Sequence, residues 1–265
     1  MLLYPDSDPV KIQTRLKTFL SISVYCLLFA LLSISWLPLQ KQNNLPADYS
    51  TVEILSPDSS KNKFIIRDEI AYLYHSLELR EKGLSFRAFE YACKGYYRLL
   101  QKKMIDEQAY LVICDFSQSS GNKRMYLVDM ANCRMVVNTY VAHGRNSGGE
   151  YARRFSNRPK SLQSSLGFYI TKNTYYGEHG LSLRMAGLEK GYNDRALQRR
   201  IVMHGADYIG EKWLQNSKAM GRSYGCPALP KKESEPIINM IKNGSCVFIY
   251  HPSSGYLNGS KILND

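Results

Sequence analysis

Short apolar segments separated by turn signals are the sequence feature that most restricts the fold. Seven such segments are rich in β-branched and aromatic residues: 110–116, 124–128, 134–142, 167–171, 181–188, 200–203 and 245–251. Two segments at 207–218 and 233–242 favour short helices instead. The pattern predicts a mainly β domain with short helices over residues 106–255, of the sandwich or barrel kind, and a C-terminal tail at 256–265.

A helical pattern precedes the β-rich part. Asp68-Glu69 suits a helix start, and apolar residues follow at helical spacing. A second helix is expected over residues 85–103, so we assign residues 68–105 as a small helical segment. Residues 41–67 are mostly polar, with Asn, Pro and Ser clusters, and are predicted to be a linker.

The N-terminus predicts export. Residues 19–37 are apolar and uncharged, which is about the length that crosses a bilayer. Three basic residues come before them: Lys11, Arg15 and Lys17. This positive flank places the rest of the chain outside the cytoplasmic membrane, in the periplasm. We assign residues 1–40 as a signal or transmembrane anchor. Ser33 and Ser35 also fit a cleavage site, so an inner-membrane anchor and a released protein are both open.

The charge balance indicates a polyanionic partner. The 265 residues carry a formal net charge of +12, which suits nucleic acid, an anionic membrane surface or an acidic wall polymer. The sequence contains no zinc finger, no RNA-binding aromatic signature and no basic recognition helix, so we expect no nucleic-acid partner.

The six cysteines show no metal-ligand spacing and no C-x-x-C pair. We therefore expect no metal and no cofactor. Cys114 and Cys246 lie in strand-like runs and are expected to be buried as small hydrophobic side chains. In an exported protein disulfides are also chemically possible.

One pair of residues suggests nucleophilic chemistry. Cys226 follows His204 by 22 positions and lies between Gly225 and Pro227. A cysteine nucleophile needs a base to take its proton and backbone N–H groups to stabilise the oxyanion. Glycine before the cysteine permits a tight turn. A cysteine near a histidine is often unrelated to catalysis, so these residue types alone do not decide the function.

The surrounding motifs resemble a known family. His204-Gly205 and residues 221–229, Gly-Arg-Ser-Tyr-Gly-Cys-Pro-Ala-Leu, are similar to the active-site signature of the L,D-transpeptidases, and in particular of the murein L,D-transpeptidase catalytic-domain subgroup. Upstream stretches at 142–148, 155–157, 164–169 and 179–183 also resemble it, so the likeness covers about residues 108–252. The wider family carries a second histidine where this chain has Tyr224, and Arg222 is our candidate for the positive charge that the family places after the cysteine.

The resemblance implies a peptidoglycan acyltransferase active in cell-wall biogenesis. Cys226 attacks the third residue of a tetrapeptide stem, D-alanine leaves, and an amine takes the acyl group to form a 3→3 cross-link. His204 acts as base and then acid, the Gly205 carbonyl orients its imidazole, and the amides of Gly225 and Cys226 hold the oxyanion. Carbapenems are expected to acylate Cys226. An L,D-carboxypeptidase with water as acceptor and a non-catalytic, membrane-anchored wall-binding protein are the alternatives.

Other polar residues are secondary candidates. Residues 221–229, which carry Cys226, are named the cysteine loop. Ser223 is expected to support this loop by hydrogen bonding. His143 and His179 are candidates for the substrate cleft, with a structural role as the alternative for His143. Arg145 and Arg222 are candidates for substrate carboxylates, because guanidinium groups suit them. The histidines lack a third ligand at typical spacing, which argues against a metal site.

Overall fold

The computed structural model describes residues 59–217 and 219–265, with side chains from residue 67 onward. The predicted membrane segment at 19–37 lies outside the described residues, as does most of the predicted linker. Within the described ranges, no helix combines the length and the apolar character needed to cross a bilayer.

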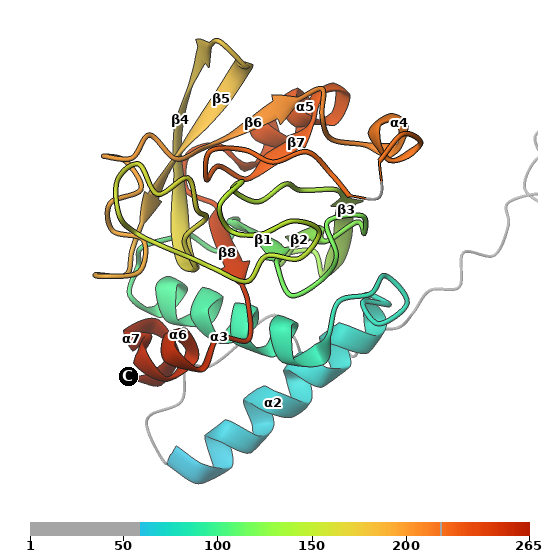
Figure 1. Ribbon diagram of the computed structural model, residues 1–265. Helices are drawn as coiled ribbons and strands as arrows, with labels where there is room; N and C mark the ends of the chain where they lie inside the picture. Colours follow the sequence, from blue (N-terminus) through green and yellow to red (C-terminus); the bar gives the residue numbers. More distant parts are fainter. Residues whose placement is uncertain (1–58, 218) are drawn as a thin grey trace, which may run out of the picture. The chain divides into compact units, whose positions relative to one another are not determined.

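In the described part of the chain, eight strands form a single sheet (Figure 1). They are β1 (Tyr110–Asp115), β2 (Met125–Asp129), β3 (Arg134–Thr139), β4 (Gly167–Gly177), β5 (Gly180–Gly187), β6 (Val202–Ala206), β7 (Ala228–Pro230) and β8 (Cys246–Tyr250). Their order across the sheet is β3-β2-β1-β8-β4-β5-β6-β7. The β1–β8 and β6–β7 pairs are parallel and the other pairs are antiparallel.

The sheet is nearly closed, because the chain that leaves the edge strand β3 reaches the other edge strand, β7. After β3, the Ala142 amide donates to the Ala228 carbonyl of β7 at 2.8 Å. The central strands β1 and β8 are buried along almost their whole length, as a strand covered on both faces must be. Phe168 of β4 stacks on Phe248 of β8 with 4.1 Å between ring centroids.

Two of the helices in the described chain pack on the sheet, and the others lie beside them or in the loops. The helices are α2 (Ser59–Ser76), α3 (Phe86–Gln101), α4 (Glu211–Leu214), α5 (Lys231–Ile241), α6 (Ser254–Gly259) and α7 (Lys261–Asn264). Helix α3 packs against β1 and β8, and also contacts α2 and α7. Helix α5 packs against β5, β6 and β7, the end of the sheet opposite β3 (Figure 1).

Helix α3 begins where its sequence predicts. Ser85 caps it, since its hydroxyl accepts from the Ala88 amide at 3.2 Å. Its apolar face is buried, including Phe89 and Leu99. In the middle of that face a glycine lets the helix approach the sheet, because a Cβ at Gly95 would lie 2.0 Å from the Phe168 ring.

A buried carboxylate attaches the C-terminal helices to the sheet. Glu189 is 5% exposed and accepts hydrogen bonds from the Phe168 amide at 2.8 Å and from the Tyr256 hydroxyl at 2.9 Å. The Ser260 hydroxyl donates to its other oxygen. Burial raises the pKa of Glu189 despite these donors. Residues 256–265, which the sequence suggested as a tail, are therefore largely helical and packed.

The mainly β architecture with short helices is confirmed. Helix α2 begins at Ser59, inside the segment assigned as linker. The helix expected over 207–218 is only the four residues of α4. His204 was expected just after a strand but lies inside β6, and β7 was missed because three residues ending in proline give little pattern.

The contact at Gly95 predicts that Gly95→Ala destabilises the protein. Alanine favours a helix over glycine by about 1 kcal/mol, but its methyl group would collide with Phe168. We expect the free energy of unfolding to fall by about 2 kcal/mol, measured by urea denaturation. Gly255→Ala is the matched control, because a Cβ at Gly255 in α6 meets nothing within 4 Å. Equal effects at the two positions would contradict the packing described for α3.

Candidate active site

Parallel strands β6 and β7 bring His204 and Cys226 to one place. His204 lies in the middle of β6, and its register partner in β7 is Ala228. Cys226 is two residues before Ala228, so it immediately precedes the strand beside the histidine. The pairing of β6 with β7 therefore brings the loop that carries Cys226 to the strand that carries His204, in keeping with the contacts of the Cys226 sulfur to Arg200 and Val202.

His204 is held in one tautomer. Its ring is 3% exposed, and Nδ1 lies 3.0 Å from the Gly205 carbonyl oxygen. Since a carbonyl only accepts, Nδ1 carries the proton and Nε2 of the neutral ring is free to act as a base. Burial lowers the pKa of His204, which favours this neutral form. Gly205 must be small, because a Cβ there would lie 2.4 Å from the Ser234 hydroxyl.

The Cys226 sulfur is partly exposed and lies against the start of β6. It accepts from the Val202 amide at 3.5 Å and donates to the Arg200 carbonyl at 3.9 Å. Among the hydrogen bonds of the described residues, none joins this sulfur to His204, so the thiol must turn from Arg200 toward the imidazole to transfer its proton. Burial raises the pKa of Cys226, while the Val202 amide and the Arg199 charge act in the opposite direction.

Ser223 closes the loop that carries the cysteine. Its hydroxyl donates to the Cys226 carbonyl at 2.6 Å and accepts from the Gly225 amide at 3.1 Å. The Gly225 amide is thus occupied, which leaves the Cys226 amide as the remaining member of the implied oxyanion pair. Gly225 has a φ of 121°, a conformation that favours glycine.

His143 lies behind the cysteine loop rather than in an open cleft. It is 1% exposed, and its Nδ1 lies 2.7 Å from Arg124 Nη2. Because arginine only donates, Nδ1 accepts and the other ring nitrogen faces the Gly148 carbonyl at 3.4 Å. Burial, assisted by the Arg124 charge, lowers the pKa of His143 to about 4. The His143 carbonyl accepts from the Ser223 amide at 3.1 Å, so this histidine supports the loop.

Arg124 was not singled out by the sequence. It is fully buried and donates twice to the Val141 carbonyl, at 3.1 and 3.0 Å, and once to the Gln118 carbonyl at 2.8 Å. Its guanidinium carbon lies 4.8 Å from the Phe116 ring centroid. A buried arginine needs such acceptors, and they tie the 141–143 segment to β2. The sequence feature that could have identified Arg124 is its position just before an apolar strand.

Three surface residues line the other side of the loop. Arg222 is exposed and donates to the Gly148 carbonyl at 3.0 Å and the Arg145 carbonyl at 3.4 Å. The Arg145 guanidinium carbon lies 6.0 Å from the ring centroid of Tyr224, which is 68% exposed. Arg145 and Arg222 therefore both remain available to an anionic substrate.

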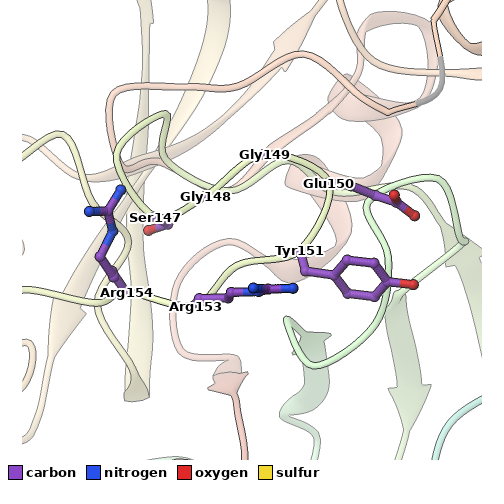
Figure 2. Close-up of a pocket in the computed structure, with 7 residues that line it drawn as sticks. All are labelled: Ser147, Gly148, Gly149, Glu150, Tyr151, Arg153 and Arg154. Carbon is purple, nitrogen blue, oxygen red and sulfur yellow. The ribbon is translucent and has the colours of Figure 1, made fainter.

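A hollow of about 600 Å³ adjoins these residues. Figure 2 shows its lining from the loop after β3: Ser147, Gly148, Gly149, Glu150, Tyr151, Arg153 and Arg154. Arg153 and Arg154 are exposed, and the Arg222 bond to Gly148 joins the hollow to the cysteine loop. Its two guanidinium groups suit carboxylates.

His179 stacks on His204. It lies in the turn between β4 and β5, and its ring centroid is 4.3 Å from that of His204, with 21° between the planes. Although His179 is exposed, it covers one face of the His204 ring. Its positive charge, when present, lowers the pKa of His204 further. The turn thus shields the imidazole from water.

No cluster of potential metal ligands occurs among residues 67–217 and 219–265. The five cysteines of the described chain are all free: Cys93, Cys114 and Cys246 are buried, Cys133 is exposed and Cys226 is intermediate. The expected burial of Cys114 and Cys246 is confirmed. Cys226 is thus the free thiol that lies beside a histidine-bearing strand.

Sequence comparison places this site in a family. The model of the L,D-transpeptidase catalytic domain matches residues 80–250, which include His204 and the cysteine loop. The chain belongs to the family of L,D-transpeptidase catalytic domains. A search of curated proteins found no match.

Solved structures of L,D-transpeptidases are similar at low identity. An enzyme from Mycobacterium smegmatis is 10% identical, with 54% of this chain and 58% of that chain covered and a TM-score of 0.33. A mutant enzyme from Enterococcus faecium is 12% identical, with 55% and 50% covered and a TM-score of 0.33. One from Stackebrandtia nassauensis is 16% identical, with 61% and 67% covered and a TM-score of 0.31. The chain spans 58% of the length of the first of these and 50% of the second.

The buried state of His143 predicts a pH-dependent stability. Its pKa is about 4 in the folded chain against 6.5 unfolded, so only the unfolded state gains a proton as the pH falls from 6.5 to 4. Stability is therefore lost in that window, by about 3 kcal/mol. Urea denaturation at pH 7 and pH 4.5 should show a smaller loss in His143→Asn, which still accepts from Arg124. Parallel losses in the two proteins would contradict a neutral, buried His143.

Proposed function

We propose that this protein is a peptidoglycan L,D-transpeptidase with Cys226 as nucleophile and His204 as base. The observation that carries the proposal is the pairing of β6 with β7, which puts a cysteine beside a buried histidine whose Nδ1 proton is fixed on the Gly205 carbonyl. This arrangement leaves Nε2 free to take the thiol proton. The family of the chain supplies the reaction class.

His204 and Cys226 have a separate role in each step of this reaction. His204 Nε2 takes the proton from Cys226, and the sulfur attacks the carbonyl carbon of the third stem residue. The Cys226 amide stabilises the oxyanion. When the C–N bond breaks, His204 returns the proton to the amine of the leaving D-alanine. The thioester then passes its acyl group to an amine of a second stem, which loses a proton to His204.

We assign the stem peptide to the surface between the cysteine loop and the hollow beyond Gly148. Stem peptides carry free carboxylates, and the exposed guanidinium groups of Arg145, Arg153, Arg154 and Arg222 surround this surface. A basic chain also suits an anionic wall polymer. The basic flank and apolar segment at 19–37 support placing the domain in the periplasm, either anchored in the membrane or released.

Product analysis tests the proposal. Purified protein incubated with disaccharide-tetrapeptide should yield free D-alanine and cross-linked dimers, detected by mass spectrometry. Cys226→Ala should abolish both products, and His204→Gln should slow them about 10²- to 10⁴-fold. Cys133→Ser is the matched control, because that thiol is exposed but distant in sequence from the motif. Tripeptide without dimer would instead identify an L,D-carboxypeptidase, and no product at all would favour a wall-binding protein.

Carbapenems should acylate the same cysteine. Their strained β-lactam carbonyl is attacked by a thiolate, and ring opening leaves the whole molecule attached. We expect the intact mass to rise by one carbapenem per chain in the wild type and in Cys133→Ser. In Cys226→Ala the mass should not change. An adduct that persists in Cys226→Ala would place the reactive nucleophile elsewhere.

A further inference from the structure

Arg199 is a half-buried cation that pairs with no carboxylate among residues 67–217 and 219–265. It lies in the segment between β5 and β6 and binds only neutral acceptors on residues 156–165. These are the Ser156 carbonyl at 2.7 Å, the Ser165 hydroxyl, the Ser161 hydroxyl at 3.2 Å and the Gln163 carbonyl at 2.6 Å. None of the ion pairs formed by the described residues includes Arg199. Four hydrogen bonds thus fix a positive charge that forms no ion pair within the described chain.

The fixed charge lies beside the cysteine loop. A Cβ at Gly225, the residue before the cysteine, would lie 3.3 Å from Arg199 Nη2. The Cys226 sulfur in turn bonds to the Arg200 carbonyl and the Val202 amide, which follow Arg199 in the chain. Arg199 Nη2 thus lies near the residue before the cysteine, and the sulfur bonds to backbone groups one and three residues after Arg199.

A thiolate at this position needs a cation other than the histidine. Burial raises the pKa of Cys226, and the charge of Arg199 lowers it. Burial also lowers the pKa of His204, so its imidazolium is not a standing partner. Of the nearby phenols, Tyr208 has a pKa raised to about 12 by burial and stays neutral. Tyr224 extends into solvent on the cysteine loop.

We propose that Arg199 is the standing counter-charge of the Cys226 thiolate. The inference rests on the proposed function, because it concerns the ionised form of the nucleophile. The thiol proton moves to His204 Nε2, the sulfur keeps its electron pair beside the guanidinium, and this pair then forms the C–S bond. Arg199 acts through Cys226 and is a positioning residue. It takes the role first considered for Arg222, whose guanidinium binds the carbonyls of the neighbouring loop instead.

The pH dependence of thiol alkylation tests this inference directly. The full chain is treated with iodoacetamide from pH 5 to pH 10, and alkylation of the Cys226 peptide is followed by mass spectrometry. We expect Arg199→Gln to raise the midpoint by about one pH unit and to slow alkylation about tenfold below it. Arg199→Lys, which keeps the charge, should shift the midpoint by less than half as much. Arg195→Gln is the control for an equal loss of charge on an exposed residue. An unchanged midpoint in Arg199→Gln, or an equal shift in Arg195→Gln, would overturn the proposal.

A second measurement needs no variant and covers the case in which Arg199→Gln does not fold. On the wild-type protein, the rate ratio of anionic iodoacetate to neutral iodoacetamide should be several-fold higher at Cys226 than at the exposed Cys133. A ratio no higher than at Cys133 would overturn the counter-charge. Because alkylation needs no peptidoglycan, a shifted midpoint together with a failed product assay would reject the proposed function and keep the role of Arg199.

Discussion

Three backbone hydrogen bonds between residues 142–145 and the cysteine loop are the contacts on which the rest of the structure depends. They join the Ala142 amide to Ala228, the Ser223 amide to His143, and the Arg145 amide to Ser223. Each contributes about 1 kcal/mol to stability, but their geometric effect is larger. They close the sheet and fix the cysteine beside β6, in a segment that has little regular structure of its own. Buried Arg124 anchors the same segment from the opposite side.

Much of the fold could be predicted from local sequence. Strands such as β1 and β8 are short runs of branched and aromatic residues. Ser85 is a typical N-cap residue and marks the start of α3. The misses have local causes. Helix α4 is short because Gly210 starts it late, at a φ of 123°. Helices α6 and α7 overlap the predicted tail, and they pack because Tyr256, Leu257, Ile262 and Leu263 are buried and Glu189 binds Tyr256 and Ser260.

The site could be predicted only as far as its motifs. Cys226 and His204 were identified by their neighbours in sequence, and so was the supporting serine. The contacts that surround them were not, because Arg199 beside the cysteine loop, Arg124 on His143 and His179 on His204 come from distant segments. No spacing rule links residue 124 to residue 143, or residue 179 to residue 204. Such contacts exist only after β2, β3, β5 and β6 have taken their places in the sheet.

The stacking of His179 on His204 has a consequence for how such a domain can vary. One face of the His204 ring is covered by a two-residue turn at the tip of the β4–β5 hairpin, while His204 itself belongs to the interior of the sheet. The turn lies outside the paired residues of the hairpin, so insertions there leave the core packing intact. Lengthening this turn would widen the entrance to the imidazole without changing the strand that carries it. The exposure of the His204 ring is thus adjustable independently of the geometry of the sheet.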